Sequence, residues 1–221
     1  CGALRWRPHI WLTGGPGCGK STILNQFVHA LVAESGIFAQ GNSTEAGIRQ
    51  TLKADAIPVL FDESEQNEEN EKRRVQSILS LIRQASTESQ ARTFKGTSGG
   101  DAMHFHVRSM FCLASIQVGI KHQADIERLT LLILRRKDDS PQSVSEWHSI
   151  RERMYTTIAK DRTVSARMLR RAILLLPMIR ESINVFAEIA AEKFGSQREG
   201  DQYGTMLAGA WCLARQTSVT R

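Results

Sequence analysis

The chain has 221 residues, of which 41% are hydrophobic and 24% are charged, and it carries a formal net charge of +6. This composition is ordinary for a soluble globular protein, and no run of eighteen apolar residues is present, which excludes a membrane-spanning helix. The positive charge permits binding to a polyanion such as nucleic acid. Because the chain begins with Cys1 and not with Met, we expect it to be part of a longer polypeptide.

The first predicted elements are a strand at residues 9–13 and a helix at residues 20–34, joined by a glycine-rich loop. Residues 14–21 read Gly-Gly-Pro-Gly-Cys-Gly-Lys-Ser, a complete phosphate-binding pattern, G-x-x-x-x-G-K-[ST]. Glycines in such a loop let backbone N–H groups surround the phosphates of a nucleoside triphosphate. We therefore expect ATP to be bound by Gly14, Gly15, Pro16, Gly17, Cys18, Gly19, Lys20, Ser21 and Thr22.

Two side chains of this loop have specific expected roles. Lys20 would contact the β- and γ-phosphates, which makes it a catalytic candidate, and the Ser21 hydroxyl would bind Mg²⁺. The alternative is a chance match in an unrelated glycine turn. The apolar residues before the loop and the helical pattern after it favour the phosphate-binding interpretation.

A second acidic motif follows a predicted strand at residues 37–40 and a predicted helix at residues 44–54. Residues 57–61 are an apolar run that ends in Asp62 and Glu63, the form of a Walker B strand. Ligands bind at the carboxyl ends of parallel strands, so both carboxylates should lie near the phosphate loop. Asp62 would hold Mg²⁺, and Glu63 would act as general base toward the attacking water. A solvated turn after a core strand is the alternative.

The next predicted elements complete an α/β domain. A long amphipathic helix is expected at residues 65–86, and a hairpin of two short strands at residues 91–107. Residues 109–116 and 129–134 read as apolar strands. Together these elements predict a three-layer P-loop NTPase sandwich with a mostly parallel sheet.

Only helical patterns follow residue 143, so we expect a small C-terminal helical bundle. The domain boundary should fall near Pro141, which gives an ATPase core at residues 1–140 and a helical lid at residues 141–221. Asp201 is expected to cap the last helix. The predicted helices span residues 144–160, 165–180, 182–194 and 202–214.

Two further residues are candidates for catalysis. P-loop motors carry a polar group at the end of the strand beside Walker B, and Ser115, with Gln117 in reserve, occupies that place here. They also carry an arginine that enters the neighbouring subunit's site, and Arg128, directly before the last strand, is the candidate. The alternatives are an ordinary serine at a strand end and, for Arg128, an ion pair with Asp125.

The hairpin carries candidates for nucleic-acid binding. Lys95, His104 and His106 lie around its glycine-rich tip, where basic groups could contact the phosphate backbone. Alternation places both histidines on one face of their strand. No Cys, Asp or Glu has suitable spacing to complete a metal site with them. An ordinary half-exposed strand is the alternative.

These motifs together resemble an ATPase domain of bacterial, phage and mobile-element replication proteins, often fused to a primase or encoded beside one. The residues that carry the resemblance include the phosphate loop and residues 41–50, 58–63 and 200–202, and its most specific part is residues 43–50, Ser-Thr-Glu-Ala-Gly-Ile-Arg-Gln. The resemblance covers most of the chain. It implies a ring-forming, helicase-like motor of the broad AAA+ and superfamily III type, in which a lid arginine such as Arg167, Arg170 or Arg171 often reaches the γ-phosphate.

Within the specific segment, Glu45 and Arg49 lie one helical turn apart and are expected to form an ion pair. Gly47 is unfavourable inside a helix by about 1 kcal/mol relative to alanine, which suggests a close approach at that position. We expect the segment near the active site or a subunit interface, with a packed surface helix as the alternative.

The sequence thus predicts an ATP- and Mg²⁺-dependent motor, active as a hexameric ring on DNA together with a primase or DNA-binding portion of the same polypeptide. The four cysteines are widely spaced and fit a reduced setting, the cytoplasm of a bacterial host. The rival interpretations are an ATP-dependent switch without nucleic acid, a small-molecule kinase, and a domain that binds nucleotide without assembling.

Overall fold

The computed structural model describes residues 1–62, 69–96, 102–116, 118–120, 122–136, 138 and 140–219. Its centre is a five-stranded sheet with the order β2-β3-β6-β1-β7, and all four neighbouring pairs are parallel. The carboxyl ends of these strands therefore share one edge of the sheet. The strands are β1 (His9–Thr13), β2 (Ile37–Gln40), β3 (Val59–Asp62), β6 (Phe111–Ser115) and β7 (Leu129–Ile133).

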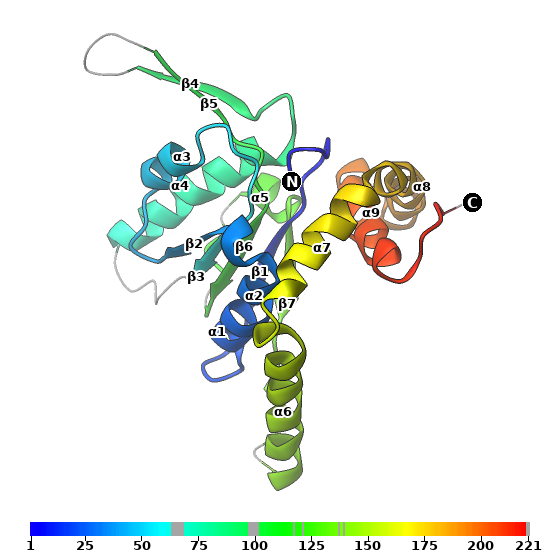
Figure 1. Ribbon diagram of the computed structural model, residues 1–221. Helices are drawn as coiled ribbons and strands as arrows, with labels where there is room; N and C mark the ends of the chain where they lie inside the picture. Colours follow the sequence, from blue (N-terminus) through cyan, green and yellow to red (C-terminus); the bar gives the residue numbers. More distant parts are fainter. Residues whose placement is uncertain are drawn as a thin grey trace.

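Helices cover both faces of the sheet, so the predicted α/β architecture is confirmed (Figure 1). Successive strand residues point to opposite faces, so β1 contributes Trp11 to one buried cluster and Leu12 to another. The Trp11 cluster packs against α3 (Glu45–Leu52) and α4 (Glu69–Ser86). Leu12 packs with Leu24 of the helical run that follows the phosphate loop. That run comprises α1 (Lys20–Thr22), a π-helical turn η1 (Ile23–Val28), α2 (His29–Val32) and the short η2 (Ala33–Ser35).

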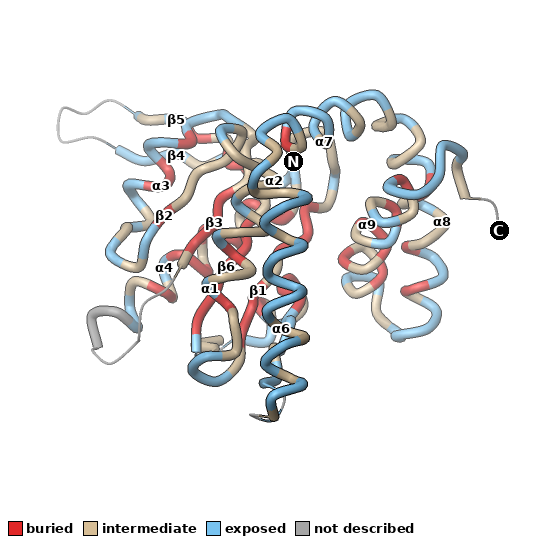
Figure 2. Tube along the Cα trace, turned by 60° about the horizontal axis from the view of Figure 1, so that its bottom comes forward, coloured by how far each residue is buried: buried red, intermediate tan, exposed pale blue. Residues whose placement is uncertain are grey.

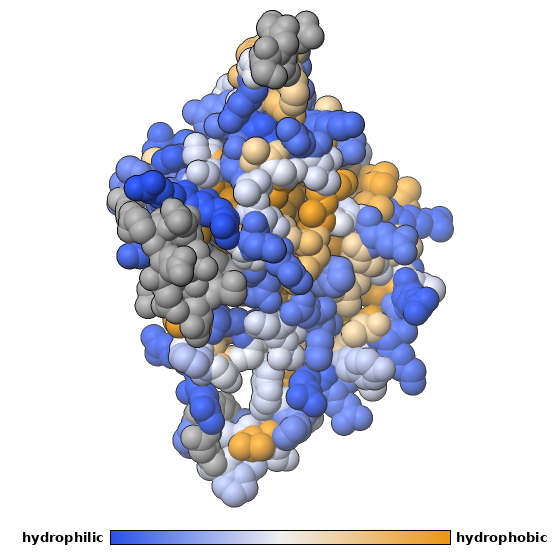
Figure 3. Space-filling view, turned by 90° about the vertical axis from the view of Figure 1, so that its left-hand side faces the viewer, coloured by the Kyte–Doolittle hydropathy of each residue, from blue (hydrophilic) through white to orange (hydrophobic). Residues whose placement is uncertain are grey.

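A two-stranded antiparallel hairpin stands apart from this sheet. It is formed by β4 (Arg92–Gly96) and β5 (Ala102–His106), and it projects from the molecule in Figure 1. Seen end-on from that side, the hairpin rises above a largely hydrophilic face (Figure 3). The predicted tip around Gly99 and Gly100 lies outside the described residues.

The short α5 (Gln123–Ile126) lies between β6 and β7, and helices make up most of the chain after β7. These are α6 (Pro141–Met154) with the π-helical turn η3 (Tyr155–Ala159), α7 (Thr163–Leu174), α8 (Leu176–Phe194) and α9 (Gln197–Ala214). α8 and α9 lie side by side, whereas α6 extends away from the rest and has no buried residue (Figures 1 and 2). Among the described residues, no helix combines the length and apolarity needed to cross a bilayer.

Two helix boundaries differ from the predicted ones, and each has a physical reason. The break expected near residue 181 falls at Leu175, because Pro177 occupies the first turn of α8, where its missing N–H costs nothing. Asp201 does not cap the last helix. Ser196 is the N-cap and accepts a hydrogen bond from Glu199 N, so α9 begins five residues earlier than predicted. The short helix α5 was not predicted.

α9 is fixed to the sheet by Gln202, whose side chain is almost fully buried. Its amide nitrogen donates to the His9 carbonyl oxygen and the Thr130 hydroxyl at 3.1 and 2.9 Å, and its oxygen accepts from the Trp6 indole at 2.9 Å. Close packing against α8 depends on Gly204, since a Cβ there would lie 2.6 Å from the backbone of Ala187. The final helix is therefore an integral part of the fold.

Candidate nucleotide-binding site

A cavity of about 640 Å³ lies at the carboxyl edge of the sheet. The phosphate loop contributes Lys20 and Ser21 to its lining, β3 contributes Asp62, and β6 contributes Ser115. These residues come from three segments far apart in the sequence. Their meeting follows from the parallel topology, which places every strand's carboxyl end at this edge.

The phosphate loop adopts backbone conformations that favour glycine. Gly14, Gly17 and Gly19 have φ angles of 146°, 72° and 89°. A Cβ on Gly14 would lie 2.3 Å from the Leu134 carbonyl oxygen, and one on Gly19 would lie 2.8 Å from the Trp147 ring. Both the backbone angle and the close approach therefore require glycine at these two positions.

Lys20 is held over the loop at the cavity. Its ammonium donates to the carbonyl oxygens of Gly14 and Gly15, both at 2.8 Å, and lies 3.6 Å from Cys18 Sγ. The side chain is largely buried, with 9% of the residue exposed. A positive charge is thus placed where the loop would surround an anion.

The donor set at the cavity suits Mg²⁺. Asp62 offers a carboxylate and Ser21 a hydroxyl, and Mg²⁺ prefers such oxygen ligands combined with phosphate oxygens and water. No cluster of three or more His, Cys, Asp or Glu occurs within the described part of the chain, so the residues do not favour a soft metal.

Ser115 lies at the cavity with its hydroxyl in a defined position. It is buried, and it accepts a hydrogen bond from the Trp11 indole at 2.8 Å. Beside it, the Thr13 hydroxyl donates to the Ile116 carbonyl oxygen at 3.2 Å. Two other predicted residues, Glu63 and the reserve candidate Gln117, lie outside the described residues.

Arg128 lies at the opposite edge of the sheet from this cavity. It directly precedes β7, whose first residue pairs with His9, and only 7% of it is exposed. Its guanidinium donates to the Ala124 carbonyl oxygen at 2.6 Å. Burial, and then the positive charge of Arg198, lower the pKa of Arg128.

The expected partner of Arg128, Asp125, is close enough to favour its charge but is paired with Arg83 at 3.4 Å. Burial raises the pKa of Asp125 despite the nearby arginines. The alternative interpretation of Arg128, a direct ion pair with Asp125, is therefore not what the structure shows, because Asp125 pairs with Arg83 and Arg128 bonds Ala124.

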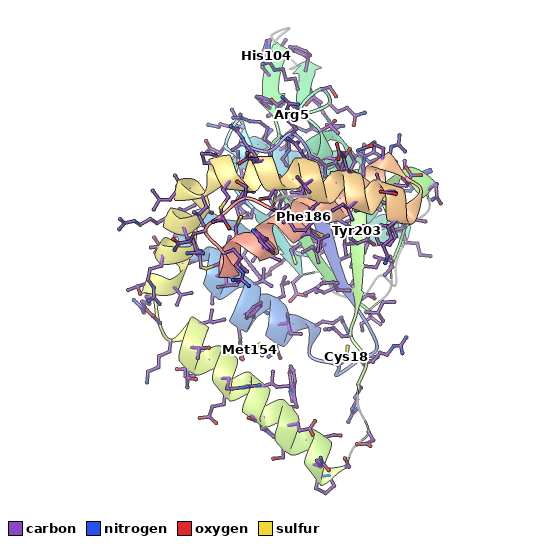
Figure 4. The ribbon with its side chains drawn as sticks, turned by 90° about the vertical axis from the view of Figure 1, so that its right-hand side faces the viewer. Arg5, Cys18, His104, Met154, Phe186 and Tyr203 are labelled. Carbon is purple, nitrogen blue, oxygen red and sulfur yellow. The ribbon has the colours of Figure 1, made fainter. Side chains whose placement is uncertain are left out.

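The hairpin residues are far from the cavity. Figure 4 shows His104 at the top of the view, well separated from Cys18 of the phosphate loop. His104 is exposed and meets Phe94 edge-on at 4.8 Å, whereas His106 bonds Glu88 at 2.8 Å. Lys95 lies 3.7 Å from Glu45. Two of the three basic candidates thus have acidic partners within the chain.

Arg49 joins the specific segment to the hairpin. It is buried, and it bonds Glu45 at 2.6 Å, as the spacing predicts, and Gln84 of α4 at 3.1 Å. It also bonds the Thr93 hydroxyl and lies 5.6 Å from the ring centre of Phe105. Three elements therefore meet at one guanidinium, which the interpretation as a surface ion pair did not predict.

Gly47 has a local explanation. The Thr44 hydroxyl caps α3 by accepting from Gly47 N at 3.1 Å, and a Cβ on Gly47 would lie 3.2 Å from that hydroxyl. The close approach suggested by the sequence is thus to the helix cap.

The three lid arginines do not border the 640 Å³ cavity. Arg167 pairs with Asp161 at 2.7 Å, and Arg171 donates to the Cys212 carbonyl oxygen at 3.0 Å. Arg170 is exposed on α7.

Two polar residues that line the cavity, Gln40 and Asn25, were not predicted as site residues. Gln40 ends β2 at the same edge as Asp62, its direct partner in the sheet, and Asn25 faces the cavity from the helical run. The strand-end rule applied to Asp62 would have found Gln40. Asn25 carries no comparable signal, because its placement depends on the helix following the loop.

Comparison with known proteins adds no family to this description. No family model matches the chain, and no curated protein matches it.

Proposed function

We propose that the chain is a P-loop ATPase domain of the AAA+ and superfamily III type, which hydrolyses ATP and uses the energy to move along or remodel DNA. The observation that carries the proposal is the cavity bordered jointly by the phosphate loop, Asp62 and Ser115. The sheet order supports it, because β6 lies between β1 and β3 and brings Ser115 between the loop and the acidic strand.

In this proposal each residue has a distinct task. The loop and Lys20 bind the phosphates. Ser21 and Asp62 would hold Mg²⁺, which would supply charge neutralisation at the β- and γ-phosphates. Glu63 accepts a proton from the attacking water. The bond from Trp11 holds Ser115 in place, which suits a group that positions the water or the γ-phosphate.

The helices of residues 141–221 serve as a lid, and the chain acts as a hexameric ring beside a primase or DNA-binding portion of its polypeptide. Arg128 was expected to contribute to the neighbouring site, but its burial and its hydrogen bond to Ala124 favour a role in folding. To act in a neighbouring subunit it would have to leave its pocket.

A second function is favoured by a specific observation at the hairpin. Lys95 lies near Glu45, and His106 is hydrogen-bonded to Glu88, so both basic side chains already have acidic partners within the chain. An ATP-dependent switch would need no basic groups free to contact DNA.

The test is ATP turnover measured with and without single-stranded DNA at several protein concentrations. Glu63→Gln serves as the control, and it should bind ATP but hydrolyse it about 100-fold more slowly, because the general base is lost. Turnover that rises with DNA, and more than linearly with protein, supports an oligomeric DNA motor. Turnover that is linear in protein and indifferent to DNA supports the switch. Turnover unaffected by Glu63→Gln contradicts the catalytic assignment.

A further inference from the structure

A second cavity, of about 370 Å³, lies on the other side of the phosphate loop. It is bordered by Gly17 and Cys18 of the loop, by the segment after β7, and by α6. Gly17 borders both cavities, so the two spaces adjoin at the loop. A volume of this size is within the range of small-molecule sites.

One face of α6 is apolar and lines this cavity. Val144, Trp147 and Ile150 recur every three residues, which places them on the same side of the helix. An apolar stripe of this kind normally packs against the protein core. Here Val144 and Ile150 remain 45% and 42% exposed, and α6 buries no residue (Figure 2).

Trp147 connects that face to the phosphate loop. Its ring is so close to Gly19 that a Cβ there would lie within 2.9 Å of two ring atoms. The indole is therefore fixed beside the residue that precedes Lys20. An aromatic ring in this place offers a flat surface next to the phosphate-binding backbone.

Charged residues of both signs border the cavity. Arg135 and Arg136 are exposed there, and one guanidinium nitrogen of Arg136 lies 3.9 Å from the Cβ position of Gly17, beside the phosphate loop. Asp138 and Glu146 also line the cavity, and the Asp138 carboxylate accepts hydrogen bonds from Ser140 and Ser143.

We propose that this cavity receives the nucleobase and ribose of the nucleoside triphosphate, with Trp147 as the stacking surface. The inference rests on the proposed function, since the loop must hold the phosphates of the same molecule. Stacking on an aromatic ring tolerates any base, because every base has a π-face. The site therefore discriminates little between ATP and GTP.

The test compares binding of ATP with binding of inorganic tripolyphosphate, by calorimetry, in the wild type and three variants. Trp147→Ala removes the stacking surface, Trp147→Phe keeps a ring, and Trp211→Ala removes a tryptophan of α9 as a matched control. We expect Trp147→Ala to weaken ATP binding about tenfold and tripolyphosphate binding less than twofold. Trp147→Phe should keep most of the ATP affinity, and Trp211→Ala should change neither.

Four results would overturn the inference in different ways. Equal weakening of ATP and tripolyphosphate would mean that Trp147 only supports the loop. Unchanged affinities with reduced self-association would mean that the apolar face of α6 contacts a second copy. A wild type that bound neither ligand would remove the proposed function as well, whereas binding of both with equal affinity would remove the base site alone.

Discussion

The two edges of the central sheet carry similar residue types but use them differently. At the carboxyl edge, Lys20, Asp62 and Ser115 line a cavity. At the amino edge, Arg128 and His9 are buried and bonded to neighbouring protein groups. Burying a charged or polar group costs free energy unless the group is hydrogen-bonded. The bonds of the amino-edge residues therefore serve the stability of the fold. A polar residue at a strand end thus indicates a site only when it faces open space.

His9 at the amino edge is completely buried. Its Nδ1 accepts from Phe111 N at 3.1 Å, and its Nε2 lies 3.1 Å from the Ser86 hydroxyl. Burial, reinforced by the positive charges of Arg7 and Arg128, lowers the pKa of His9 to about 3. The imidazole is therefore neutral in the folded chain at any pH where the protein is expected to work.

The largest expected effect is at the carboxyl edge. Lys20→Ala should weaken ATP binding by about 100-fold or more, because charge-assisted hydrogen bonds to phosphate are lost. Calorimetry with ATP and Mg²⁺ measures this, and the exposed Lys193→Ala of α8 is a matched control. Thermal unfolding of Lys20→Ala should stay near that of the wild type. Retained ATP affinity would show that the loop is only a structural turn.

A smaller effect, of a different kind, is expected for Arg128→Ala. Loss of a buried, hydrogen-bonded guanidinium should lower the free energy of unfolding by about 2 kcal/mol. Urea denaturation measures this loss, and turnover per folded molecule should change little. A mixture of the Arg128→Ala and Glu63→Gln variants tests the opposite role, in which Arg128 acts in a neighbouring subunit. If Arg128→Ala were inactive alone and active in the mixture, the arginine would be acting in a neighbouring subunit, and the two edges would share one function.

The last effect, similar in size to that of Arg128→Ala, is the pH dependence of stability that His9 causes. The unfolded histidine has a pKa near 6.5 and the folded one a pKa of about 3, so the unfolded chain binds the extra proton between these values. Stability is full above pH 6.5 and decreases as the pH falls toward 3. Between pH 7 and pH 5 this one group should cost about 2 kcal/mol.

The measurement is urea denaturation at pH 7 and at pH 5, for the wild type and for His9→Gln. The variant should be less stable at pH 7 but should lose about 2 kcal/mol less than the wild type on acidification. Equal losses would mean that His9 is accessible to protons in the folded chain.

Much of this fold could be predicted because its signals are local. β1 and β2 have the predicted bounds, since each is a short apolar run followed closely by glycine. The meeting of Asp62 and Ser115 with the phosphate loop could also be predicted, because parallel strands bring their carboxyl ends together. The helix break at Leu175 was missed because the proline was placed inside a helix and not in its first turn.

Contacts between distant segments could not be predicted. Trp147 lies beside Gly19 only because of the path that the chain takes after β7, and nothing in its own helix indicates that path. Arg128 has the right place in the chain for a catalytic arginine, yet its burial depends on α5 and on Arg198 of α9. Residue type and position in the chain identify candidate site residues. Only the structure shows which candidates line the cavity and which are buried among protein groups.

Arg49 has a mechanical consequence. The hairpin is attached through this side chain to α3 and α4, and α4 in turn holds the end of β2, because Arg74 donates to the Gly41 carbonyl oxygen at 2.8 Å. Gly41 borders the 640 Å³ cavity. The base of the hairpin is therefore linked, through Arg49 and two helices, to the end of β2 that borders the cavity, and a movement of the hairpin would act on that edge of the sheet along this path.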